Sequence, residues 1–143
     1  MMHVLDYMTE TSTLCHRISH HDIERMAESL CRMKGKLYII GLGGSWANSV
    51  HMAADLRKLC NIDAHAFTNG AELTARANDE GLENIFKDWI GDSNVWDKLF
   101  VLSVGGGTSI VSKSLCNAID SFKGQVLGIT GPHGGYTDSK ASI

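Results

Sequence analysis

The sequence has only one proline, no block of like charge and no long apolar run. Pro132 stands alone in 143 residues, and 13 lysines and arginines against 16 aspartates and glutamates leave a net charge of −3. Without a basic patch, the sequence offers no groove for nucleic acid. Its apolar runs, such as residues 37–40, are too short to cross a bilayer, and the N-terminus lacks the basic-then-apolar order of a signal peptide. We therefore expect a cytoplasmic protein that contacts neither membrane nor nucleic acid directly.

The motifs of several common cofactor sites are also missing. No glycine is followed by lysine and then serine or threonine, which excludes a P-loop. A dinucleotide fingerprint beginning at Gly41 would need glycine in place of Trp46, so we expect no nucleotide cofactor. The cysteines form no CxxC pair, and we expect them to be reduced and mostly buried. They are Cys15, Cys31, Cys60 and Cys116.

Apolar side chains follow an alternation of helix and strand. Continuous apolar runs, typical of strands buried on both faces, alternate with stretches of helical period. The expected strands cover residues 37–40, 64–67, 99–104 and 125–130. The expected helices cover about 10–34, 45–60 and 108–122, and a mixed helical region covers about 70–90. With 43% hydrophobic and 20% charged residues, this pattern predicts a single α/β domain over 1–143, built on a mainly parallel sheet.

Three glycine-rich turns follow predicted strands, and we expect them at one edge of the sheet. They cover residues 41–45, 103–109 and 130–135. The first two precede predicted helices, so backbone N–H groups and the hydroxyls of Ser45, Thr108 and Ser109 suit an anion such as phosphate. The same residue types equally suit tight turns and helix caps. The pattern leaves both interpretations open.

Two polar pairs are further candidates. His51 and Asp55 lie four residues apart on a predicted helix, so their Cβ atoms share a face at roughly 5–6 Å. They suit either a simple hydrogen-bonded pair or a metal such as zinc, which normally takes at least three protein ligands in a catalytic site. Asn78 and Asp79 suit sugar hydroxyls or a turn, and a turn is the simpler interpretation.

The order of these motifs matches a known pattern. Residues 41–45 are GLGGS and residues 51–56 are HMAADL, followed by Ala77-Asn78-Asp79, by SVGGGTSIVSK at 103–113 and by LGITGPHGG at 127–135. Together they resemble the sugar isomerase (SIS) domain family and, within it, the phosphoheptose isomerase subfamily. That subfamily typically has G-N-G-G-S, H-F-A-x-E-L, S-T-S-G-N-S-x-N-V-x-K and L-T-G-x-x-G-G at the corresponding places. The resemblance covers nearly the whole chain in unbroken order.

The resemblance implies a three-layer sandwich with a flavodoxin-like, mainly parallel five-stranded sheet. It implies a homo-oligomer, tetramer or dimer, that isomerises sedoheptulose 7-phosphate through an ene-diolate, often with zinc, on the route to the heptose of lipopolysaccharide. It places catalysis on Asp55 and His51, which also take two metal-ligand positions. The substrate-binding positions that it implies are Leu42, Gly43, Gly44, Ser45, Asn78, Asp79, Ser103, Val104, Gly105 and Thr108.

The chain departs from the family pattern at several of these positions. Asp55 replaces a glutamate and is one methylene shorter, which displaces a base by about 1 Å and costs on the order of 10²-fold in rate. Gly105 lacks a phosphate-binding hydroxyl, and Leu42 and Gly107 stand where the family has asparagine. The family also continues past the position of Ile143 with a strand and a helix, which supply a glutamine and a histidine to the site.

Two other hypotheses therefore stand beside the isomerase. One is a non-catalytic SIS module that binds a sugar phosphate or a protein partner, like the DnaA initiator-associating protein of this subfamily. Asp55, Gly105 and the absent C-terminal ligands favour it. Retention of His51, of Asn78-Asp79 and of Ser103 favours the enzyme. The other hypothesis is a truncated copy, whose sheet lacks a strand and whose exposed edge invites association.

Overall fold

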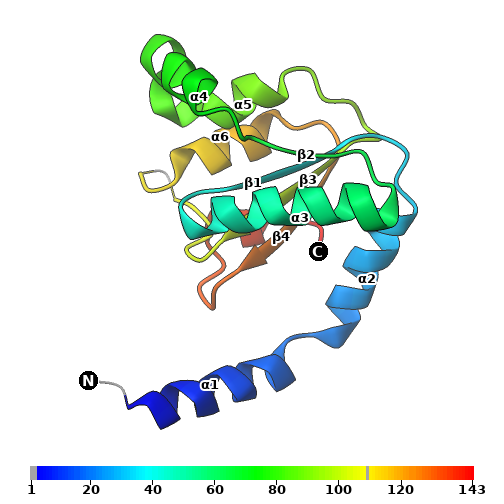
Figure 1. Cartoon of the computed structure of the whole chain (residues 1–143), viewed down its shortest axis with the longest axis vertical. Helices are drawn as coiled ribbons and strands as arrows, with labels where there is room; N and C mark the ends of the chain where they lie inside the picture. Colours follow the sequence, from blue (N-terminus) through cyan, green and yellow to red (C-terminus); the bar gives the residue numbers. More distant parts are fainter. Residues whose placement is uncertain (1–2, 109) are drawn as a thin grey trace. The chain divides into compact units, whose positions relative to one another are not determined.

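The computed structural model of the protein describes residues 3–108 and 110–143 (Figure 1). The chain divides into two compact units, one ending at Cys31 and the other beginning at Arg32. Each is described by itself below, and the single domain expected over residues 1–143 stays a prediction.

The first unit contains two helices, α1 (Val4–Arg17) and α2 (His20–Cys31). The single helix expected over residues 10–34 is therefore wrong. Ile18 has an extended backbone (φ −60°, ψ 136°), and the Oγ of Ser19 accepts the backbone N–H of Asp22 at 3.2 Å. A serine hydroxyl that caps a new helix competes with continuation of the preceding one. The apolar period runs through both helices, so it does not reveal the break.

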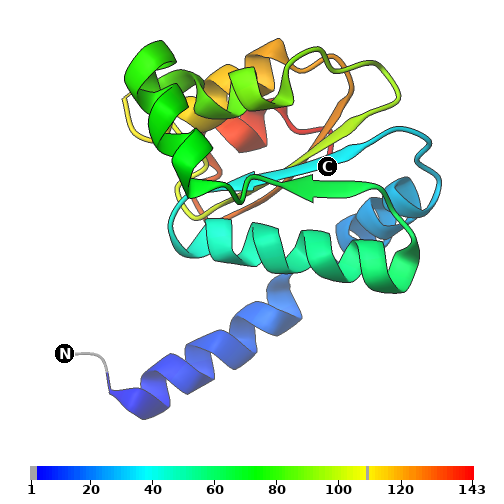
Figure 2. The ribbon, with the colours of Figure 1, turned by 45° about the horizontal axis from the view of Figure 1, so that its top comes forward.

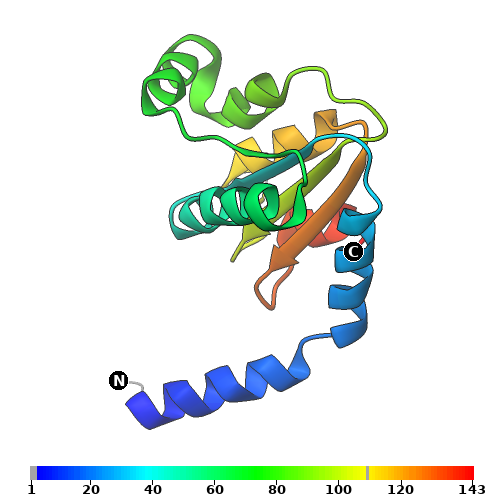
Figure 3. The same cartoon turned by 45° about the vertical axis from the view of Figure 1, so that its right-hand side comes forward.

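The second unit is built on four parallel strands in the order β2-β1-β3-β4. They are β1 (Leu37–Gly41), β2 (Ala64–Ala66), β3 (Lys98–Ser103) and β4 (Gln125–Thr130). Figure 3 shows β1, β3 and β4 side by side. The predicted α/β architecture and parallel sheet are confirmed, but the described residues form four strands, so the fifth strand is not confirmed.

The last residues of the chain lie along the edge strand β4. The backbone N–H of Ser142 donates to the carbonyl of Val126 at 2.9 Å, and the N–H of Gly128 donates to the carbonyl of Ile143 at 3.0 Å. The backbone of residues 142–143 therefore extends the hydrogen bonding of the sheet beyond β4.

Helices cover both faces of the sheet. The connections contain α3 (Gly44–Cys60), α4 (Gly70–Arg76), the π-helical turn η1 (Ala77–Gly81), the 3₁₀ turn η2 (Leu82–Asn84), α5 (Ile85–Ile90), α6 (Lys113–Ser121) and α7 (Gly135–Lys140). Figure 2 shows α3 on one face and α5 and α6 on the other. The parallel strands thus lie between two helical layers, as continuous apolar runs require.

Packing on both faces of the sheet explains why the central strand positions form continuous apolar runs. Ile40 and Val101 are paired across β1 and β3 and fully buried, and they belong to one cluster with Ile85, Phe86 and Leu115. The alternate strand residues Leu37, Ile39 and Phe100 are buried as well, and the register places them on the opposite face. Both faces therefore lose their apolar surface to packing, which stabilises the fold by about 25 cal/mol per Å² buried.

The structure also tests what the sequence predicts for the cysteines. All four cysteines are free thiols, but only Cys116 is buried, so the prediction of mostly buried cysteines is wrong. Cys15, Cys31 and Cys60 occupy exposed helix positions, which the apolar character of the thiol alone does not predict. Among the described residues, no helix combines the length and apolar character needed to cross a membrane.

Candidate functional site

The turns that follow β1, β3 and β4 come together at the carboxyl edge of the parallel sheet. They are the β1–α3 turn (Leu42 and Gly43), the β3–α6 loop (residues 104–112) and the β4–α7 turn (residues 131–134). Helix α3 begins at Gly44, directly after Gly43 with its positive φ of 59°. Gly43 and Gly44 have no atom within 4 Å of the place a Cβ would take, so this backbone is open to a ligand.

The β3–α6 loop and the β4–α7 turn are joined by hydrogen bonds. The N–H groups of Tyr136 and Thr137 donate to the carbonyls of Gly107 and Gly106, each at 2.9 Å, and the buried hydroxyl of Thr137 donates to the same Gly106 carbonyl at 2.7 Å. The N–H of Gly131 donates to the carbonyl of Val104 at 3.0 Å. The expected gathering of these two turns is therefore confirmed.

The β3–α6 loop uses its own hydroxyls to close itself. Thr108 Oγ1 accepts the backbone N–H groups of Ile110 and Val111 at 3.2 and 2.9 Å, and Ser103 Oγ accepts the N–H of Gly106 at 3.1 Å. Helix α6 begins at Lys113, so the helix expected from Thr108 starts too early in the prediction. Residue 109, whose serine hydroxyl was a candidate anion ligand, lies outside the described residues.

The late start of α6 has a conformational cause. Gly106, Gly107 and Ser112 have positive φ angles of 66°, 84° and 58°, which a right-handed helix does not accept. The turn held by Thr108 lies between them. The loop is therefore a bonded structure of its own, and not the first turn of a helix.

A cleft of about 340 Å³ opens between the β1–α3 turn, η2 and the β3–α6 loop. We call it the edge cleft. It is lined by Leu42, Leu82, Glu83, Ile110, Ser112, Lys113 and Ser114. Of the predicted substrate positions, Leu42 lines it and the other nine do not. Lys113 lies in a stretch that carried the family resemblance, whereas Leu82 and Glu83 had no signal in the sequence.

His51 and Asp55 form the expected pair on the exposed face of α3. His51 Nε2 lies 3.2 Å from Asp55 Oδ2, and the side chains are 81% and 50% exposed. Neither residue lines the edge cleft. Among the described residues, no group of three or more histidine, cysteine, aspartate or glutamate side chains could hold a metal ion. The pair thus offers two donors, where a catalytic zinc site normally takes three from protein.

Asn78 and Asp79 lie in η1, the π-helical turn that leads to Leu82 and Glu83. The Asn78 amide donates to Asp79 Oδ1 at 2.8 Å, and both side chains are exposed. Turns of this type occur frequently at functional sites. The pair lies in chain order directly before one wall of the edge cleft without lining it.

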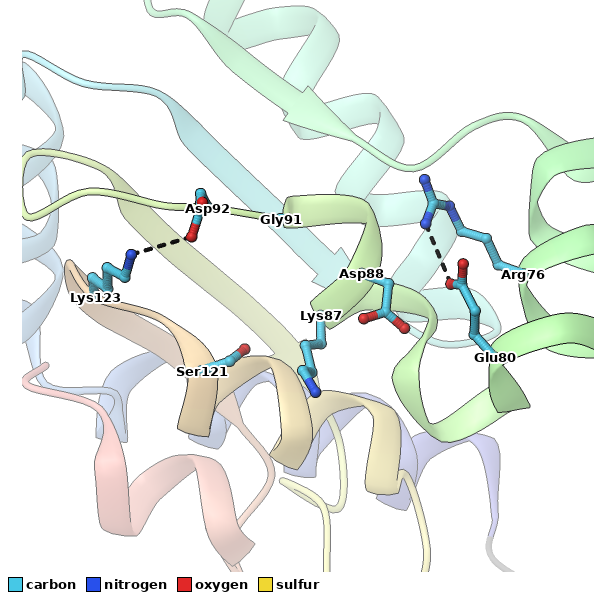
Figure 4. A pocket seen from close by; sticks show the side chains of 8 residues that line it. All are labelled: Arg76, Glu80, Lys87, Asp88, Gly91, Asp92, Ser121 and Lys123. Atoms are coloured by element: carbon cyan, nitrogen blue, oxygen red, sulfur yellow. Dashed lines mark hydrogen bonds and ion pairs between the residues drawn. The ribbon is translucent and has the colours of Figure 1, made fainter.

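A second hollow, of about 610 Å³, lies beside α5 and carries balanced charge (Figure 4). Arg76 is bound to Glu80 at 3.4 Å and Lys123 to Asp92 at 3.2 Å, and Lys87 and Asp88 also line the hollow. The hydrogen bond that Arg76 Nε donates to Glu72 Oε1 at 2.9 Å is the main reason that the pKa of Arg76 is raised. Three cations thus face three carboxylates, which favours neither an anion nor a cation as ligand.

The buried thiol of Cys116 on α6 forms a hydrogen bond with the β3–α6 loop. Its Sγ donates to the carbonyl of Thr108 at 3.4 Å, and burial raises its pKa, with the charge of Asp120 as a second cause. A thiol with a raised pKa stays protonated at neutral pH and is a poor nucleophile. Cys116 is therefore a packing residue of the loop.

No protein-family model matches the chain. It is 35% identical over 112 residues to a phosphoheptose isomerase of Rhodospirillum rubrum, and 32% identical over 120 residues to one of Geotalea daltonii. These matches cover 73% and 79% of this chain but 58% and 62% of the two relatives, so the chain spans less than two thirds of their length.

Two solved structures have the same fold. A phosphoheptose isomerase from Neisseria gonorrhoeae superposes with a TM-score of 0.80 at 26% identity, covering 94% of this chain and 74% of that one. A phosphoheptose isomerase from Francisella tularensis superposes with a TM-score of 0.78 at 21% identity, covering 99% of this chain and 82% of that one. At 21% identity, the second likeness concerns the fold alone.

Proposed function

This chain belongs to the phosphoheptose isomerase family, and from that membership we propose that it isomerises a sugar phosphate between its aldose and ketose forms. The proposed substrate is sedoheptulose 7-phosphate or a close analogue. The similarity to the relatives from R. rubrum and N. gonorrhoeae supports the proposal, together with the turns gathered at the carboxyl edge of the sheet.

One observation carries the catalytic part of the proposal, namely the His51–Asp55 pair on α3. Aldose–ketose isomerisation removes a proton from one carbon beside the carbonyl, forms an ene-diolate and returns a proton to the neighbouring carbon. A carboxylate or imidazole must accept that proton. Asp55 is the proposed base, and the imidazole of His51, 3.2 Å away, holds the carboxylate in place and exchanges protons with it. Both groups are exposed and thus within reach of a substrate.

Substrate binding falls to the turns in this proposal. The backbone of Gly43 and Gly44 is open to close approach, as a tightly held ligand requires. The remaining proposed binding residues are Leu42, Ser45, Asn78, Asp79, Ser103, Val104, Gly105 and Thr108. Binding of the phosphate end positions the reacting carbons, so contacts remote from the chemistry contribute to the rate.

In this proposal His51 and Asp55 would supply two of the protein ligands of a zinc ion. The described residues supply no third donor beside them, so the site that this chain offers is incomplete. A bound zinc ion would stabilise the developing oxyanion when a further ligand completes the site.

We also propose that the protein acts in the cytoplasm as a homo-oligomer, dimer or tetramer, within a single SIS domain that serves lipopolysaccharide heptose synthesis. The free thiols of the described residues are compatible with a reducing compartment. Light scattering measures the oligomeric state directly, and a monodisperse monomer would contradict this part of the proposal.

The direct test is turnover of sedoheptulose 7-phosphate by the purified chain, with and without added zinc. We expect product formation that Asp55→Asn lowers by at least ~10²-fold, since removal of a general base typically costs 10²–10⁴-fold. A matched control is Asp63→Asn, which removes an exposed carboxylate that pairs with His65 beside β2. Equal activity of the Asp55→Asn and Asp63→Asn variants would contradict the role of Asp55.

A second candidate function is a non-catalytic module that binds a sugar phosphate or a protein. The observation that favours it is the exposed two-donor pair, for which the described residues provide no third metal ligand. Under this function, calorimetry detects sugar phosphate binding while turnover is absent at every zinc concentration. A pull-down with a replication initiator tests the version with a protein partner.

A further inference from the structure

The edge cleft combines an apolar wall with one cation and one anion. Leu82 and Ile110, which are 62% and 86% exposed as whole residues, line the cleft together with Leu42. Lys113 and Glu83 are its charged residues. The cleft therefore suits a ligand that has both an anionic group and hydroxyls.

Part of what the β3–α6 loop could offer an anion is already used in hydrogen bonds within the loop. The N–H groups of Ile110 and Val111 already donate to Thr108 Oγ1, and the N–H of Gly106 donates to Ser103 Oγ. Val104 and Gly105 carry no side-chain hydroxyl. A cation at a neighbouring position therefore adds to what the loop can offer an anion at this edge.

Lys113 is the cation available at that position. It is the first residue of α6 and lines the edge cleft, and no ion pair among the described residues involves it. The cations of the second hollow differ in this respect, because Arg76 and Lys123 are both bound to carboxylates. An ammonium group without a carboxylate partner can bind a phosphate oxygen without first breaking another contact.

The walls of the cleft are held in place before any ligand binds. The amide of Asn117 on α6 donates to the carbonyl of Glu83 at 2.9 Å and to Asn84 Oδ1 at 3.2 Å, which ties η2 to α6. The Thr108 turn fixes the other side. A cleft with fixed walls loses little entropy on binding.

We propose that Lys113 binds the phosphate group of the substrate in the edge cleft and that Glu83 accepts hydrogen bonds from the hydroxyls of the sugar. The inference rests on the proposed function for the identity of the ligand. It assigns the anion contact to a lysine of α6, where the family pattern uses the hydroxyls of the β3–α6 loop. Both residues lie outside the His51–Asp55 pair and make no covalent step.

The test titrates wild type, Lys113→Gln and Lys113→Arg with sedoheptulose 7-phosphate and with inorganic phosphate in a calorimeter. We expect Lys113→Gln to raise the Kd of both ligands by about 10- to 100-fold, because a charge-assisted hydrogen bond is lost. Lys113→Arg keeps the charge and restores binding to within a few-fold of wild type. Glu83→Gln raises the Kd of sedoheptulose 7-phosphate but leaves the Kd of inorganic phosphate unchanged.

The matched control is Lys87→Gln, which makes the same charge change on α5, in the second hollow. It should leave both Kd values unchanged, and thermal unfolding of every variant checks the fold. An unchanged Kd in Lys113→Gln, or a wild type that binds neither ligand, overturns the inference. Binding that depends on Lys113 but comes without turnover supports the inference and contradicts the proposed isomerase. Turnover with an unchanged KM in Lys113→Gln supports the proposed isomerase and contradicts the inference.

Discussion

Gly106 is the tightest point of the contact between the β3–α6 loop and the β4–α7 turn. A Cβ at this position would overlap the carbonyl oxygen of Gly134, and the φ of 66° is one that other residues rarely adopt. The Gly106 carbonyl also accepts two hydrogen bonds from Thr137. A single residue thus determines how closely two turns, about 30 positions apart in the chain, approach each other.

We predict that Gly106→Ala lowers the free energy of unfolding by about 2–4 kcal/mol, because the methyl group adds overlap to a strained φ. Urea denaturation followed by circular dichroism measures the change. The control is Gly105→Ala in the same loop, where nothing lies within 4 Å of the added Cβ and the effect should stay below about 0.5 kcal/mol. Equal losses in the two variants would show that the overlap is not the cause.

At the scale of elements, the residue at which a helix begins determines where the side chains of the candidate site lie. Asn69 caps α4, since its Oδ1 accepts the N–H groups of Ala71 and Glu72 at 3.1 and 3.2 Å. Helix α4 then runs directly into η1, which carries Asn78 and Asp79. The position of that pair therefore depends on a cap nine residues earlier.

We predict that Asn69→Ala destabilises the protein by about 1 kcal/mol, since two N–H groups of the first turn lose their acceptor. Asn69→Asp keeps an acceptor at the same place, and its carboxylate also suits the positive end of the helix, so it should stay close to wild type. Urea denaturation of the three proteins measures both effects. A loss in Asn69→Asp as large as in Asn69→Ala would rule out capping as the explanation.

The apolar pattern of the sequence predicts some helix boundaries and misses others. The helical period of α3 is continuous with the glycine turn before it, so its start was predicted within one residue. The start of α6 at Lys113 and the break at Ile18 were missed. In both cases a hydroxyl, of Thr108 or Ser19, takes backbone N–H groups into a turn, and apolar periodicity contains no trace of that competition.

At the scale of the whole molecule, Cys116 and Tyr136 are two of the groups that link the free energy of unfolding to alkaline pH. Burial raises the pKa of Cys116, and the hydrogen bond from the Tyr136 hydroxyl to Asp120 raises the pKa of Tyr136. Both groups hold their protons to higher pH in the folded chain than in the unfolded chain. Their contribution is therefore complete below the unfolded pKa values and is lost as pH rises through the folded ones.

We predict that the free energy of unfolding falls as pH rises above about 8.5, where half of the unfolded cysteine is already ionised. Cys116→Ala should be less stable than wild type at pH 7 but should show a shallower fall between pH 8.5 and 10. Chemical denaturation at a series of pH values measures this slope. Cys60→Ala, which removes an exposed thiol of α3, serves as the control and should keep the slope of wild type.

Sequence by itself determined the alternation of helix and strand, the parallel sheet and the meeting of three glycine turns at its carboxyl edge. Each of these follows from local periodicity and from glycine in the chain, together with the rule that parallel strands end at one edge. It also placed His51 and Asp55 on one helix face, and their 3.2 Å contact confirms that geometry. The metal and catalytic roles of the pair stay predictions.

Only the tertiary structure decided which residues form a cleft and which hydroxyls remain available to a ligand. Leu42, Leu82 and Lys113 lie 31 to 71 positions apart in the chain, and the packing of η2 and α6 brings them together. Because the sequence has no block of like charge, its composition predicts no charged surface patch that would mark such a site. The anion contact that we propose for the cleft uses one lysine, and the fold alone brings this lysine to the cleft, because no local pattern marks a contact between distant segments.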